Sequence, residues 1–77
     1  MSEKHVLKIL PEYFEAVALG KKPFEIRKND RNYQVGDQVI LHEYIPNHGF
    51  TGQWQTKEIT YITDYEQKDG YVVFGIN

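Results

Sequence analysis

Four residues in the first half of the chain combine, at short spacing, the functional groups of a ligand-binding site. Gly20, Lys22, Glu25 and Arg27 spell the pattern G-x-K-x-x-E-x-R. A lysine can meet a phosphate as a point charge, and an arginine can meet a phosphate or a carbonyl group as a two-pronged donor. Because a carboxylate repels phosphate, Glu25 suits another role: acceptor for an exocyclic amine, orienting partner for a cation, or general base.

Positive charge gathers around this pattern, although the whole chain of 77 residues has a formal net charge of −2. The overall charge argues against a protein that coats duplex DNA, which needs a broadly basic face. Segment 20–31 contains two carboxylates and five cations, namely Lys21, Lys22, Arg27, Lys28 and Arg31. We expect Lys21, Lys28 and Arg31 to add longer-range attraction for an anionic ligand. The alternative is a solvated surface, on which Glu25 simply pairs with Arg27.

The pattern lies where a helix is expected to end and a strand to begin. Residues 5–10 alternate as a strand, Pro11 suits a helix start, and Gly20 suits the position after a helix of about residues 11–19. Further strands are expected at 23–29, 39–44, 54–65 and 71–77, with a loop at 46–53 and turns at 36–37 and 69–70. This order predicts one domain, residues 1–77, with a mostly-β (α+β) fold: a small β-barrel of about five strands.

Two predictions concern which side chains face inward. Phe14, Phe24 and Phe74 are expected in the core. In the strand at 23–29, Phe24 and Ile26 are expected to face inward, and Glu25 and Arg27 to face outward.

Several classes of protein and site have no support in the sequence. Without cysteine, a disulfide scaffold and a thiolate metal site are excluded. No motif for zinc, nucleoside triphosphates or dinucleotides is present, so we expect neither a metal nor a cofactor. The chain shows no membrane-spanning segment and no signal peptide, which leads us to expect a cytoplasmic location.

The motif and its flanks resemble a known family. With "VGDQVIL" following after a short gap, G-x-K-x-x-E-x-R resembles the ASCH domain of the PUA-like superfamily. Nearly the whole chain is similar to a compact bacterial and phage subgroup, in which "H-x-LKI-x-PEYF", "G-K-x-x-FEIRKNDR" and a terminal "YVVxGI" recur in this order. The resemblance implies a PUA-like β-barrel with a helix after the first strand. It also implies RNA or nucleotide binding in a cleft beside that helix.

This implied cleft suggests a role for each charged residue of the motif. Lys22 and Arg27 would hold phosphate or base carbonyl groups, and Glu25 would read an amine or orient the basic residues. Other possible cleft residues are His5, Lys8, Glu43 and Tyr44.

Two other functions are considered. Some bacterial ASCH proteins look like amidohydrolases that deacetylate N4-acetylcytidine with a lysine, a threonine and a later glutamate. The lysine maps to Lys22, but the threonine position holds Glu25, whose attack on an amide would give an anhydride. This departure favours binding, while a water activated by Glu25, with Glu43 as a second carboxylate, stays open. The third possibility is a protein-interaction module that binds its partner through residues 45–54.

Overall fold

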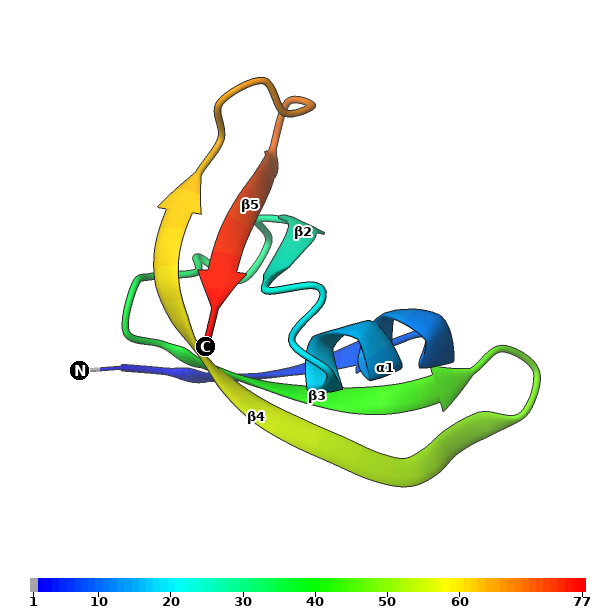
Figure 1. Ribbon diagram of the computed structural model, residues 1–77. Helices are drawn as coiled ribbons and strands as arrows, with labels where there is room; N and C mark the ends of the chain where they lie inside the picture. The colour runs from blue at the N-terminus through cyan, green and yellow to red at the C-terminus, as the bar shows by residue number, and fades with distance from the viewer. Residues whose placement is uncertain (1) are drawn as a thin grey trace.

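The computed structural model describes residues 2–77, which form one helix and five strands (Figure 1). The elements are β1 (Lys4–Ile9), α1 (Pro11–Ala18), β2 (Phe24–Lys28), β3 (Gln38–Ile45), β4 (Gly49–Thr63) and β5 (Tyr71–Ile76). The predicted mostly-β fold with a single helix after the first strand is therefore confirmed over the described residues.

The five strands belong to one mixed sheet with the order β1-β3-β4-β5-β2. β1 pairs with β3 in parallel, and the other pairs are antiparallel. Figure 1 shows β4 as a long bent strand, which pairs with β3 up to Glu58 and with β5 from Ile59 onward.

The sheet is open, whereas the sequence predicted a barrel. β1 and β2 are its two edges and form no ladder with each other. Between them, Arg27 of β2 donates a hydrogen bond from Nη2 to the backbone oxygen of Lys8 in β1, at 2.8 Å. A side chain thus spans the gap across which a closed barrel needs backbone pairing.

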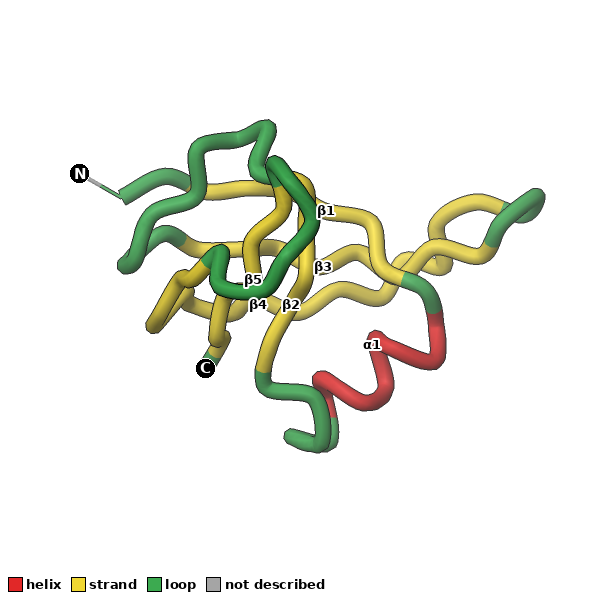
Figure 2. The backbone as a smooth tube through the Cα atoms, turned by 90° about the horizontal axis from the view of Figure 1, so that it is seen from above, coloured by secondary structure: helices red, strands yellow, loops and turns green. Residues whose placement is uncertain are grey.

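Helix α1 ends in a turn that leads the chain back to β2. Gly20 adopts a φ of +76°, and the N–H groups of Lys21 and Lys22 both donate to the oxygen of Ala16, at 2.9 and 3.1 Å. Figure 2 shows the short loop between the helix and β2. The helix packs on β3, and Gln55 Nε2 donates to the Phe14 oxygen at 3.0 Å. Nowhere in residues 2–77 is a helix long and apolar enough to span a bilayer.

The core is formed mainly by strand residues, and the helix adds Val17 to it. Its buried apolar residues are Leu7, Ile9, Val17, Tyr33, Val39, Leu41, Ile59, Val72, Phe74 and Ile76. Phe74 is fully buried and Phe14 packs against this core, as predicted. The prediction for Phe24 was wrong, because this side chain is 38% exposed.

The predicted loop at 46–53 is also largely strand. Its tight turn is closed by a hydrogen bond from the N–H of His48 to the oxygen of Ile45 at 2.9 Å, and β4 begins directly afterwards. Gly49 pairs with Ile45, and Phe50 with Tyr44. The glycines in this segment led to the prediction of a loop. Glycine also permits a positive φ within a strongly twisted hairpin, and Gly49, with a φ of +101°, is an example.

Asp37 forms a buried polar network that ties β1 to the turn before β3. Its carboxylate accepts hydrogen bonds from the backbone N–H groups of Glu3 and Gln34, both at 3.0 Å. His5 Nε2 lies 2.8 Å from the same carboxylate, and both side chains are buried. The contacts of Asp37 with Glu3 and His5 join segments more than 30 residues apart.

We expect acid to weaken the fold through this network. The Glu3 backbone N–H, followed by the His5 side chain, lowers the pKa of Asp37 below its ordinary value. The carboxylate therefore stabilises the folded state fully above its unfolded pKa of about 3.9, and this contribution is lost as the pH falls through the lower folded pKa. Urea unfolding from about pH 6 to about pH 2 should show a steeper loss of unfolding free energy for the wild type than for Asp37→Asn. Equal slopes would contradict this assignment.

Candidate functional site

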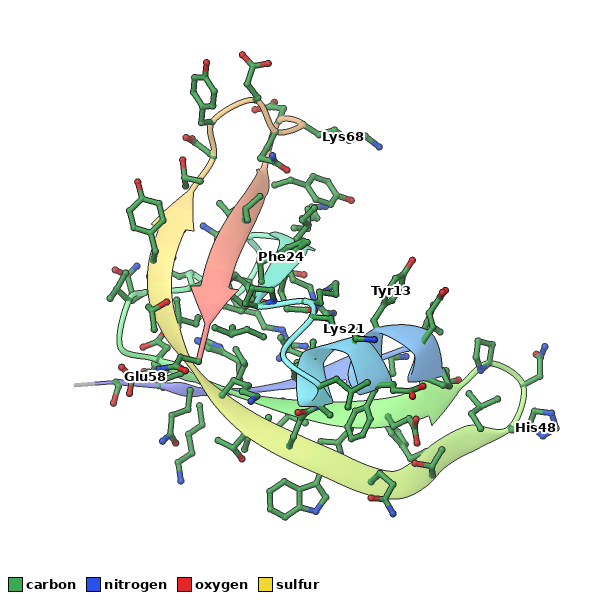
Figure 3. All side chains as sticks on the ribbon, viewed as in Figure 1. Tyr13, Lys21, Phe24, His48, Glu58 and Lys68 are labelled. Carbon is green, nitrogen blue, oxygen red and sulfur yellow. The ribbon has the colours of Figure 1, made fainter. Side chains whose placement is uncertain are left out.

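A pocket of about 540 Å³ lies between the end of β1, helix α1 and β2. We call it the motif pocket; its lining residues are Lys8, Ile9, Leu10, Tyr13, Lys22, Phe24, Glu25, Ile26 and Arg27. In Figure 3, Tyr13 projects from α1 on the side where Phe24 lies on β2. The pocket combines apolar and aromatic walls with a small group of charged residues.

Glu25 is the buried centre of a three-residue ion network in this pocket. The residue is only 3% exposed. Lys22 Nζ donates to Oε2, and Arg27 Nε donates to Oε1 at 3.0 Å, with Nη2 2.9 Å from the same oxygen. Burying a lone carboxylate costs several kcal/mol, and ion pairs with further hydrogen bonds offset that cost. The three side chains together carry one positive charge, which favours an anionic or electron-rich ligand.

The orientation of β2 is the reverse of the predicted one. Glu25 points inward, while Phe24 and Ile26 are exposed and line the pocket. The expected pairing of Glu25 with Arg27 is present, but it lies inside the protein rather than on a solvated face. Alternation along a strand distinguishes two faces, and here the charged face turns inward because Lys22 and Arg27 neutralise the carboxylate.

Lys22 is held in place from several directions. Besides Glu25, its ammonium group donates to the backbone oxygen of Phe24 at 2.9 Å. The Nζ atom lies 5.4 Å from the ring centre of Tyr13 and 5.0 Å from that of Phe24, within the range of cation–π attraction. Since an ammonium group has three N–H donors, these two hydrogen bonds leave one donor for a ligand.

Arg27 also retains donors after its internal contacts are counted. Nε and Nη2 contact Glu25, and Nη2 reaches the Lys8 oxygen. Within residues 2–77, no hydrogen bond or ion pair involves Nη1. A guanidinium group has five N–H donors, so the two on Nη1 can serve a ligand. The paired cations therefore present hydrogen-bond donors in a fixed arrangement.

The structure distributes the ten predicted site residues over several places. Lys8, Lys22, Glu25 and Arg27 line the motif pocket, and Lys8, Arg27, Lys28 and Arg31 line a neighbouring groove. Lys21 is exposed and lines neither. His5 belongs to the Asp37 network, Glu43 accepts a hydrogen bond from Thr51 Oγ1 at 2.7 Å, and the ring of Tyr44 lies 4.7 Å from Lys8 Nζ.

Sequence reasoning missed the apolar walls of the pocket. Tyr13, Phe24 and Ile26 are partly exposed here, although none was predicted as a site residue. The available signal was Tyr13, an aromatic residue of the predicted helix that was not among the residues expected in the core. For Phe24 and Ile26 no signal was available, because their exposure follows from the burial of Glu25 on the opposite face of β2.

Comparison with known proteins places the chain in a family. It is 45% identical over 64 residues to "Uncharacterized 12.9 kDa protein in GpA 3'region" of Escherichia phage P2. The alignment covers 83% of this chain but only 58% of the phage protein, so the chain spans less than two thirds of that relative. Residues 4–76, which include every residue of the motif pocket, match the family described as "Domain of unknown function (DUF3850)". The chain therefore belongs to the DUF3850 family.

Proposed function

We propose that the motif pocket binds a nucleotide, either free or as part of RNA. The observation that carries the proposal is the burial of Glu25 between Lys22 and Arg27, which holds two cations in fixed positions at a pocket with aromatic walls. A nucleotide has chemistry for both parts. Its base is a flat ring that can pack against apolar and aromatic side chains, and its phosphate and carbonyl oxygens accept hydrogen bonds.

The contacts of Glu25 support an orienting role over reading of an exocyclic amine. Each of its oxygens already accepts from a cation, and the residue is almost fully buried. The free donors belong instead to Lys22 and Arg27. We therefore expect the ligand to present acceptor oxygens to this site. The resemblance to the ASCH domain, whose implied cleft lies beside the helix and is lined by the same motif, supports the same function.

Titration of the labelled protein with nucleotides tests this proposal. Uridine 5′-monophosphate and short single-stranded RNA should shift amide NMR signals of residues 8–13 and 22–27. Lys22→Ala should weaken binding by about 10- to 100-fold, because it removes a charge-assisted hydrogen bond. Lys21→Ala is the matched control, since it removes a lysine from the neighbouring position, which does not line the pocket. Absence of shifts at millimolar ligand, or equal losses in the two variants, would contradict the proposal.

The geometry supports binding more than hydrolysis of a modified pyrimidine nucleoside. A general base needs a free oxygen within hydrogen-bond reach of the attacking water. Among the pocket residues, Glu25 is the one carboxylate, and both of its oxygens are engaged by Lys22 and Arg27. Glu43 contacts Thr51 instead. The same titration with N4-acetylcytidine should therefore show binding without release of acetate.

One observation favours the protein-interaction alternative. Phe50 and Trp54 in β4 are each 60% exposed, and both rings lie near His42, at 5.9 and 6.5 Å between ring centres. Exposed aromatic clusters of this kind occur at protein-interaction sites. This alternative predicts no affinity for RNA in the titration above, together with a partner surface on the β3–β4 hairpin.

A further inference from the structure

A second pocket, a groove, adjoins the motif pocket and is lined by more cationic side chains than the motif pocket is. This groove has a volume of about 240 Å³, and its lining residues are Val6, Leu7, Lys8, Arg27, Lys28, Asp30, Arg31 and Tyr33. It shares Lys8 and Arg27 with the motif pocket. The two hollows therefore meet where the Arg27 side chain bridges to the Lys8 backbone, at the gap between the sheet edges.

The charges around the groove are unbalanced. Four cationic side chains line it, against the single carboxylate of Asp30. Arg27 is paired with Glu25, but Lys28 and Arg31 are exposed and form no ion pair within residues 2–77. An anion in this groove would therefore meet two cations that form no ion pair with a carboxylate.

Tyr33 supplies a polar group that has no other evident use in the fold. The residue is only 4% exposed, and its backbone N–H donates to Asn29 Oδ1, but no hydrogen bond within residues 2–77 involves its hydroxyl group. Every buried polar side-chain atom in these residues has a partner, so the hydroxyl must be accessible to solvent, and Tyr33 lines the groove. Tyrosine is protonated at neutral pH, and burial raises the pKa of Tyr33 further, so the hydroxyl is a hydrogen-bond donor there.

We propose that the groove binds the phosphate of a second nucleotide, so that the ligand is single-stranded RNA of at least two nucleotides rather than a free nucleotide. This inference rests on the proposed function of the motif pocket. One nucleotide occupies that pocket, and the chain crosses the Arg27–Lys8 bridge. The next phosphate lies among Lys28, Arg31 and the Tyr33 hydroxyl. The two hollows adjoin because they share Lys8 and Arg27, and the regularly spaced phosphates of a polynucleotide allow it to extend from one to the other.

Binding of uridine 5′-monophosphate, the trinucleotide of uridine, and a short oligoglutamate peptide tests this inference. The trinucleotide should bind the wild type about tenfold or more tighter than the monophosphate. Arg31→Ala and Tyr33→Phe should each weaken trinucleotide binding by a larger factor than monophosphate binding, and should thus reduce this difference. Arg31→Ala should also lower the salt dependence of trinucleotide binding by about 0.7 in the logarithmic slope, the value for one phosphate on a single strand. Lys68→Ala, which removes a lysine outside both hollows, is the control.

The possible outcomes separate this inference from the proposed function. Equal affinities for the monophosphate and the trinucleotide would overturn the inference and leave nucleotide binding in the motif pocket intact. Loss by the same factor for both ligands in Arg31→Ala would also overturn it, because the groove would not act separately. If oligoglutamate bound as tightly as the trinucleotide, the groove would be a general polyanion surface, and the inference of an RNA ligand would be overturned. Failure of both nucleotide ligands to bind would refute the proposed function itself.

Discussion

Glu25→Gln is expected to weaken nucleotide binding about 10- to 100-fold, although in the proposed site Glu25 contacts the two cations and not the ligand. The glutamine amide has nearly the same shape but lacks the charge that holds Lys22 and Arg27. Its NH₂ group would also face one of the two cationic donors that now contact the carboxylate. Both cations would become more mobile, and binding would lose the benefit of their fixed positions.

The measurement is calorimetric titration of uridine, cytidine, adenosine and guanosine monophosphates into wild type and variant. An orienting role predicts a similar loss for all four, whereas reading of an exocyclic amine predicts that cytidine and adenosine lose most. Glu43→Gln is the matched control, because it neutralises a carboxylate outside the pocket. Thermal unfolding of each variant separates lost binding from lost folding. Unchanged affinity in Glu25→Gln, or a base-dependent loss, would refute the orienting role.

Asp37→Asn is expected to have the largest effect on stability, about 2–4 kcal/mol of unfolding free energy. The asparagine keeps one oxygen, which can still accept the Glu3 N–H. Its NH₂ group takes the place of the oxygen that now accepts from Gln34 and contacts His5. A donor would then face a donor in a buried site, where an unsatisfied polar group is costly.

Urea and thermal unfolding at neutral pH measure this effect. For a domain of this size, each kcal/mol lowers Tm by about 4–8 °C, so the expected decrease is roughly 8–30 °C. Asp64→Asn is the control, since Asp64 is exposed and its side chain has no hydrogen bond within residues 2–77; a change below about 0.5 kcal/mol is expected there. A similarly small change in Asp37→Asn would mean that the network contributes little to folding.

The local features of the fold were predictable because short-range chemistry determines them. Pro11 and Gly20 mark the limits of α1 through the geometry of their own backbones, and the predicted turn at 36–37 forms, with Gly36 at a φ of +96°. The motif residues Lys22, Glu25 and Arg27 could be selected for the same reason, since a basic pair around a carboxylate is visible in the sequence. Their joint position beside the helix follows from their closeness along the chain.

Only the tertiary structure decided which of these residues are buried and which contacts they form. Glu25 is buried because Lys22, in the loop after the helix, and Arg27, held by the Lys8 oxygen of β1, meet its two oxygens. The Lys8 contact joins residues 19 apart, and no local pattern encodes it. Once the carboxylate is neutralised inside, β2 must expose Phe24 and Ile26, and they become pocket walls. The sequence by itself determined which charges are close together, whereas long-range packing determined which of them are buried and which can meet a ligand.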